Sequence, residues 1–189
     1  MSVRNIHDLV QLVPWQESWG MHYHIEKQGI IGALLADELY VEVFHVGSTS
    51  VKGMVAKPII DILVCPYEHV PLENIILHLE RIGYKNLGEC GRPGRFFLTS
   101  GDQPGETFYL HLCYKDHQVA QDQLLFQRLE RRVPAVFQGY YKLKTSLAAL
   151  FPDNRLMYRE LKGTFIDGVL SAYRAGQNPG GGGKEDASS

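Results

Sequence analysis

The four residues Gly47-Ser48-Thr49-Ser50 follow an apolar segment and carry the clearest chemical signal in this chain. A glycine, three hydroxyl groups and successive backbone N–H groups can cradle a phosphate where a strand passes into a helix. Asp61 lies further along, inside an apolar run that is typical of a strand buried on both faces. If the turn and the carboxylate meet at one end of adjacent strands, they form a site for a metal-bound nucleotide.

Two basic residues could hold phosphate oxygens at such a site. Lys57 would act as a point charge, and Arg95 would offer its guanidinium as a bidentate fork. Both side chains could instead be solvated charges beside a turn. His45, which ends the strand before the glycine, could orient the loop, carry a proton or serve as a hydrogen-bonded structural residue.

Three further side chains could complete the site. His111 alternates with leucines on an expected strand, so it should face away from the core, where it could join Asp61. Lys144 and Lys162 lie on expected helices beside tyrosines. These lysines could contact the base or the phosphates of a nucleotide, or they could cover the edge of the core.

The elements that must position these residues follow from hydrophobic periodicity and turn residues. Strands are expected at residues 40–46, 59–65, 84–87, 95–99 and 107–114. Helices are expected at residues 24–39, 71–82, 120–132, 134–150 and 154–175. We therefore expect an α+β fold with a mixed, largely antiparallel sheet of about five strands and helices packed on it. Residues 1–175 should form one domain, followed by a disordered glycine-rich tail over residues 176–189.

Composition excludes several classes of protein. The chain has 189 residues and a net charge of -2, so no overall field attracts it to nucleic acid, and general nucleic-acid binding is not expected. No signal peptide or membrane span is recognisable, and the three cysteines lack metal-binding spacing, so we expect buried thiols in a cytoplasmic protein without membrane partners. The sequence also lacks a serine-hydrolase elbow, a Walker motif and a dinucleotide-binding motif.

The segment from His45 to Ile62, with its Gly-Ser-Thr-Ser turn and its Lys57-Pro58-Ile59-Ile60-Asp61 run, resembles the signature of the GrpB family. This family is a branch of the nucleotidyltransferase superfamily, whose fold resembles the catalytic core of DNA polymerase beta. The resemblance covers roughly residues 10 to 170 and includes motifs in both the strands and the C-terminal helices.

The resemblance implies an enzyme that transfers a nucleotidyl group from a nucleoside triphosphate, with ATP as the first candidate, to an unidentified acceptor. It implies Mg²⁺ as cofactor, Asp61 as metal ligand, and Asp61 with His111 as catalytic residues. The superfamily motif, however, has two carboxylates at alternate strand positions, whereas Ile59 and Leu63 flank Asp61 here. The alternative is therefore an inactive module that binds a nucleotide or phosphorylated metabolite. A link to coenzyme A metabolism is a further hypothesis, because GrpB-like domains also occur fused to dephospho-CoA kinase.

Overall fold

A mixed sheet of five strands forms the centre of the computed structural model, which describes residues 9–67, 70–103 and 105–177. The strands lie in the order β1-β2-β5-β4-β3. Their bounds are β1 Val41–Val46, β2 Ile59–Pro66, β3 Lys85–Asn86, β4 Phe96–Ser100 and β5 Thr107–Leu112. Strands β2 and β5 are parallel, and the other neighbouring pairs are antiparallel. The predicted fold class, with its largely antiparallel sheet, is confirmed.

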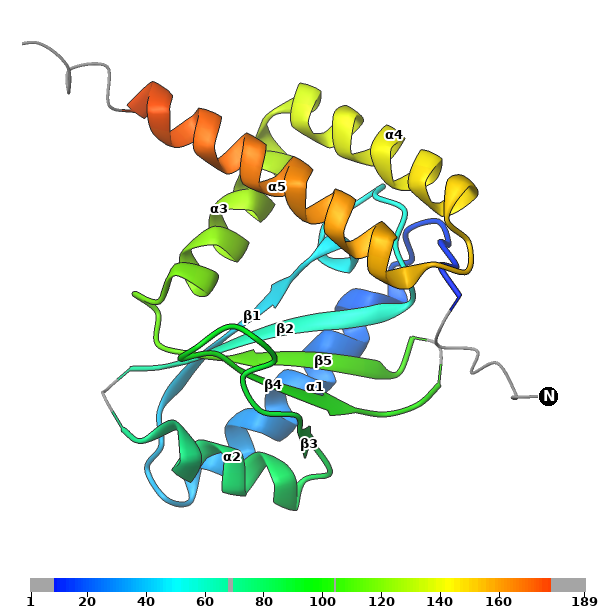
Figure 1. Ribbon diagram of the computed structural model, residues 1–189. Helices are drawn as coiled ribbons and strands as arrows, with labels where there is room; N and C mark the ends of the chain where they lie inside the picture. Colours follow the sequence, from blue (N-terminus) through cyan, green and yellow to red (C-terminus); the bar gives the residue numbers. More distant parts are fainter. Residues whose placement is uncertain (1–8, 68–69, 104, 178–189) are drawn as a thin grey trace, which may run out of the picture.

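Helices lie on both sides of this sheet (Figure 1). Their bounds are α1 Ser18–Leu35, α2 Leu72–Arg81, α3 Gln118–Arg132, α4 Pro134–Leu150 and α5 Arg155–Gln177. A short 3-10 helix, η2 Ser48–Ser50, follows β1. Helices α3, α4 and α5 gather around the end of β1 where η2 begins, while α2 lies at the opposite end of the molecule (Figure 1).

The main core lies between one face of the sheet and helices α1 and α2. Strand alternation sends Ile60 and Ile62 of β2, and Leu110 and Leu112 of β5, to this face, where each is fully buried against residues such as Trp19. Burying one such aliphatic side chain contributes roughly 1.5 to 3 kcal/mol. This core fixes the register of β2 and β5, and thereby the side chains on their other face.

The opposite face of the sheet is covered unevenly. Leu63 and Cys113 are buried against the first turn of α3 through Val119 and Ala120. Asp61 lies two residues before Leu63 on the same face, and 32% of its side-chain surface remains exposed. The expectation that Asp61 lies in a strand buried on both faces is thus wrong at this position, because the cluster under α3 includes Leu63 but stops short of Asp61.

Several element boundaries differ from the sequence-based expectation, and those of the first helix differ most. The first helix begins six residues before residue 24, because Trp19 and Tyr23 extend its buried face, and it ends early at Leu35. Just beyond that end, Glu38 has a positive φ of 55°, which breaks the helical conformation. Helix α5 continues to Gln177, two residues past the expected domain limit. The rest of the expected disordered tail, residues 178–189, lies outside the described residues.

The three cysteines are free thiols, as expected, but they are not all buried. Cys65 and Cys113 are buried, whereas Cys90 is exposed in the loop before β4. Within the described ranges, none of the helices combines the length and apolar character needed to cross a bilayer.

Candidate functional site

The sheet register brings the glycine turn and the aspartate together. Val46, the last residue of β1, pairs with Asp61 on β2, and Asp61 in turn pairs with Tyr109 on β5. Gly47 follows immediately with a φ of 67° and a ψ of -174°, a conformation that is almost restricted to glycine. A Cβ atom at Gly47 would lie 2.5 Å from Oδ2 of Asp61. The backbone of the turn therefore packs directly on the carboxylate.

Two of the hydroxyl groups in the turn are used to hold its shape. Thr49 is 2% exposed, and its Oγ1 lies 3.0 Å from Nε2 of His45. The Ser50 hydroxyl donates to the Gly47 carbonyl at 2.6 Å and accepts a hydrogen bond from Gln127 on α3. Both hydroxyls thus have partners within the fold, as buried polar groups in a tight turn require, and their contact with a nucleotide stays a prediction. Ser48 is half-buried and shares a hydrogen bond with Tyr140 on α4.

His45 is a structural residue of this turn. Its ring stacks on Tyr23 at a centroid distance of 4.7 Å, and burial lowers its pKa to about 4. Nearby Arg131 and His24 lower the pKa further, while Asp61 opposes the shift. His45 is therefore neutral at physiological pH, and its ring can accept or donate a hydrogen bond within the turn.

His111 lies beside Asp61, as strand alternation predicted. Its Nε2 is 3.9 Å from Oδ1 of Asp61, and its ring packs against Phe97 on β4 at 5.3 Å. The distance to the carboxylate is too long for a hydrogen bond. The other ring nitrogen, Nδ1, is buried and has no hydrogen-bond partner among the described residues. A small movement of either side chain would join His111 and Asp61.

Three lysines from different elements gather around the turn and Asp61: Lys57 precedes β2, Lys144 lies on α4 and Lys162 lies on α5. Burial, together with the charges of Arg155 and Lys162, lowers the pKa of Lys57 to about 8. Burial and the charge of Lys162 likewise lower the pKa of Lys144 to about 7. Among the residues that the structure describes, no carboxylate lies within ion-pairing distance of these lysines.

Lys144 is buried beneath the loop that follows the turn. It is 1% exposed, and its Nζ donates a hydrogen bond to the carbonyl of Val55, in the loop between the turn and β2. The predicted direct contact between Lys144 and a nucleotide is therefore not available in this arrangement, because loop 51–57 covers the ammonium group. Lys144 instead adds positive charge under the loop. Lys162 is half-buried, with its ammonium 5.3 Å from the Tyr158 ring.

Helix α5 contributes two arginines that the sequence reasoning missed. Both Arg155 and Arg159 lower the pKa of Lys57, so both lie in its electrostatic neighbourhood. Arg155 donates a hydrogen bond of 2.8 Å to the Tyr109 hydroxyl, next to Asp61 in the sheet. With Lys162 they form a basic row at positions i, i+4 and i+7, the spacing of one helix face. We call Lys57, Lys144, Lys162, Arg155 and Arg159 the basic cluster.

Arg95 lies apart from the basic cluster, contrary to the expectation that it binds the same phosphates. It precedes β4, whose first residue Phe96 pairs with Leu112 at the far end of β5 from Asp61. Roughly 10 Å of strand separates Leu112 from the level of Tyr109. Arg95 is 5% exposed, and its guanidinium lies over the Phe97 ring at 5.4 Å.

A comparison of sequences assigns the chain to a family. A model of the GrpB protein family matches residues 9–172. The chain belongs to the GrpB family. A UPF0157 protein of Pseudomonas aeruginosa is 32% identical over 91% of this chain and 71% of its own length. The glutamate-rich protein GrpB of Alkalihalophilus pseudofirmus is 29% identical over 86% of this chain and 94% of its own length.

A solved structure agrees with this assignment. A crystal structure of the conserved protein GrpB from Enterococcus faecalis aligns with 87% of this GrpB-family chain and 99% of its own, with a TM-score of 0.71 and 31% identity. The Cid1 poly(U) polymerase bound to MgGTP aligns with 69% of this chain and 41% of its own at a TM-score of 0.47 and 13% identity, which is too weak to support a conclusion. The chain spans less than half, 45%, of one relative, the UPF0157 protein YqkA of Bacillus subtilis.

The residues of this GrpB-family site do not fit a protein-held magnesium centre. Magnesium takes oxygen ligands in octahedral geometry, and proteins usually bind it through one or two carboxylates together with water and substrate phosphates. Within the described residues, no three His, Cys, Asp or Glu side chains are arranged to bind a metal ion. Beside Asp61 lie His111, an imidazole, and the fully buried Leu63. The surrounding basic cluster would also repel a free cation, so the site favours anions.

Proposed function

We propose that this GrpB-family chain binds a nucleoside triphosphate, or another phosphorylated metabolite, through phosphate groups seated between the Gly47–Ser50 turn and the basic cluster. The observation that carries the proposal is the convergence of Lys57, Lys144 and Lys162 without a carboxylate in ion-pairing distance. Like charges held together in a partly buried place destabilise the folded state, as the lowered pKa values of Lys57 and Lys144 indicate. Asp61 and Glu130 oppose the shift of Lys144 without cancelling it, so a bound anion would offset the remaining cost.

Phosphate chemistry fits the geometry of this site better than carboxylate or sulfate ligands of lower charge would. A triphosphate carries several negative charges, which match the several cations that meet here from a loop and two helices. Lysine acts on phosphate as a point charge, and arginine as a planar fork, and both kinds of donor are present on α5. Gly47 lets the backbone of the turn pack against Asp61, since a side chain at this position would collide with the carboxylate.

Isothermal titration calorimetry tests this proposal with tripolyphosphate, the four nucleoside triphosphates and coenzyme A as ligands. We expect tripolyphosphate alone to bind, because the contacts are made to phosphate, and we expect the affinity to fall as salt is added. A nucleotide that binds more tightly than tripolyphosphate would identify the natural class of ligand, and coenzyme A tests the link to its metabolism. If none of these ligands binds at low ionic strength, the proposal is wrong.

Nucleotidyl transfer from a magnesium–nucleotide complex is the second candidate function. The observation in its favour is that Asp61 contacts the turn directly and still exposes 32% of its side-chain surface. A carboxylate in this position could face the metal ion that accompanies a bound triphosphate. Release of pyrophosphate from a radiolabelled triphosphate, assayed with hydroxyl and amine acceptors, distinguishes transfer from binding alone.

The variant Asp61→Asn separates the two functions by opposite results. If the site binds phosphate without a protein-held metal ion, removing the carboxylate removes a repulsion, and tripolyphosphate should bind about threefold to tenfold more tightly in the absence of magnesium. If Asp61 is a metal ligand, the variant should lose magnesium-dependent affinity and pyrophosphate release. Asp102→Asn, at an exposed loop position, is the matched control and should change neither quantity.

A further inference from the structure

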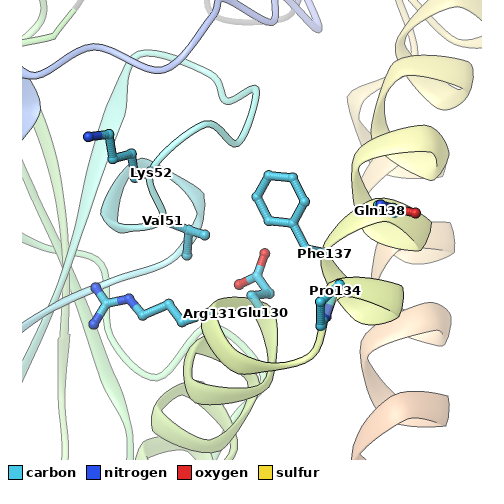
Figure 2. Close-up of a pocket in the computed structure, with 7 residues that line it drawn as sticks. All are labelled: Val51, Lys52, Glu130, Arg131, Pro134, Phe137 and Gln138. Atoms are coloured by element: carbon cyan, nitrogen blue, oxygen red, sulfur yellow. The ribbon is translucent and has the colours of Figure 1, made fainter.

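A pocket lies beside the turn, between the C-terminal end of α3, the start of α4 and the loop after η2. Its volume is about 340 Å³. The lining residues are Val51, Lys52, Glu130, Arg131, Pro134, Phe137 and Gln138. In Figure 2 the Glu130 carboxylate rises from the end of α3 toward the Phe137 ring, with Val51 across from it. The volume is at the lower end of the range for pockets that bind small molecules.

Glu130 is an unusual residue to find in this wall. Its side chain is buried, with 3% of its surface exposed, and Oε1 has no hydrogen-bond partner among the described residues. A buried carboxylate without a partner is costly, since desolvation is not offset by a hydrogen bond. Burial raises the pKa of Glu130 to about 7, while Lys144, Lys162 and Arg131 oppose the shift. Oε1 of Glu130 can therefore accept a hydrogen bond that the described residues do not supply.

The rest of the pocket limits what that donor can be. Val51, Pro134 and Phe137 form apolar walls, and the Phe137 ring is stacked near Tyr141 with a centroid distance of 6.3 Å. Flat apolar walls suit a planar ring. The exposed Lys52 and Arg131 stand at the rim, and Lys144 lies in the electrostatic neighbourhood of the carboxylate. These cations disfavour an ammonium ligand and favour a neutral N–H donor.

We infer that this pocket binds a planar heterocycle through its exocyclic amino group, which donates to Glu130 while the ring packs against Phe137. The amino-bearing nucleobases cytosine and adenine belong to this class, and glutamate is a known acceptor for the amino group of cytosine. Rotation about the last side-chain bond of Glu130 exchanges its two oxygens, so either can face the ligand. The inference concerns a pocket outside the basic cluster, and it does not require phosphate.

Free nucleosides test this inference because they carry no phosphate. Cytidine carries an amino group where uridine carries a carbonyl group. Adenosine and inosine differ in the same way. Titrations are followed through the ¹³C-labelled methyl groups of Val51, which line the pocket. At a pH above the Glu130 pKa of about 7, we expect cytidine and adenosine to shift the Val51 signals and to bind about tenfold more tightly than uridine and inosine, because the latter present a carbonyl to the ionised carboxylate.

Substitutions assign the preference to named residues. Glu130→Gln preserves the shape and should reduce the tenfold preference to less than about threefold, since the amide oxygen can accept from an amino group and the amide nitrogen can donate to a carbonyl group. Phe137→Ala should weaken the binding of all four nucleosides and leave the preference for cytidine and adenosine unchanged. Glu80→Gln, on the exposed side of α2, is the control. Equal binding of cytidine and uridine by the unsubstituted protein overturns the inference, and so do an absent Val51 shift and an unchanged preference in folded Glu130→Gln.

Discussion

Alanine in place of Gly47 will lower the free energy of unfolding by about 3 kcal/mol or more. Two costs add at this position. The φ of 67° is unfavourable for any residue with a side chain, and the new Cβ would lie 2.5 Å from Oδ2 of Asp61, so the turn or the strand has to move. Because the turn is part of the proposed phosphate site, the folded fraction of the variant should also bind tripolyphosphate more weakly. Urea unfolding and calorimetry measure the two effects.

Gly88→Ala provides the matched control for Gly47→Ala. Gly88 has a similar positive φ of 73°, but no atom lies within 4 Å of the position of an added Cβ. The free energy of unfolding of this variant should therefore fall only by the cost of a side chain at positive φ, about 1 to 2 kcal/mol. Its binding of tripolyphosphate should be unchanged. Equal losses of stability in the two variants would mean that the turn and Asp61 are not in close contact.

Methionine in place of Lys57 will stabilise the folded protein at pH 7 by about 1 to 3 kcal/mol and weaken polyphosphate binding by about tenfold to a hundredfold. Burial and neighbouring positive charges lower the pKa of Lys57 to about 8, so its charged form is held at a cost. Methionine keeps the apolar stem and removes the charge. A substitution that raises stability and lowers affinity would identify Lys57 as a residue that serves the site rather than the fold.

The pH dependence of this stabilisation has a defined sign. The pKa of Lys57 is about 8 in the folded protein and near its ordinary value of 10.5 in the unfolded chain. Between these values the unfolded state binds more protons, so the stability of the unsubstituted protein gains from Lys57 as the pH rises. The advantage of Lys57→Met is therefore largest below pH 8 and disappears above pH 10.5.

The control for Lys57→Met is Lys142→Met, which removes an exposed lysine from α4. It should leave both stability and polyphosphate affinity close to those of the unsubstituted protein, because surface charges contribute little. Urea unfolding at several pH values between about 7 and 10 follows the difference in stability. A destabilised Lys57→Met protein would show that Lys57 is held by favourable contacts, contrary to the account given above.

Strand alternation predicted which way His111 faces, but it did not predict the exposure of Asp61. His111 was expected to face away from the core, whereas Asp61 was expected in a strand buried on both faces, and the sheet register brings the two side chains to 3.9 Å. Their shared location also required β2 and β5 to be neighbours, which pattern alone does not determine. The family resemblance supplied that adjacency before the structure did.

The hydrogen-bond contacts of the turn hydroxyls and of Lys144 could not be predicted from local sequence. Thr49 and Ser50 turn inward because His45 and Gln127 offer them partners, and Gln127 lies far along the chain. Lys144 stands on the buried face of α4 with Tyr140 and Leu147, but its contact with the loop carbonyl of Val55 has no signal in the helical spacing. Such contacts depend on tertiary packing between α3, α4 and the loop after η2.

Other features of the site had a signal in the sequence that was overlooked. Arg155, Arg159 and Lys162 recur at helical spacing, which would have predicted one basic face on α5. The separation of Arg95 also follows from an antiparallel pairing of β4 with β5, because the start of one strand then lies at the end of the other. Glu130 gave no such signal, since a glutamate near a helix end is usually exposed.

The amide spectrum of ¹⁵N-labelled protein during a titration with tripolyphosphate tests the phosphate site most directly. The account predicts saturable shifts of the Gly47–Ser50 and Lys57 amides, together with the first turns of α5, and weaker binding at higher salt. Shifts centred on Arg95 and the β4 edge, or a spectrum that does not change, would contradict it.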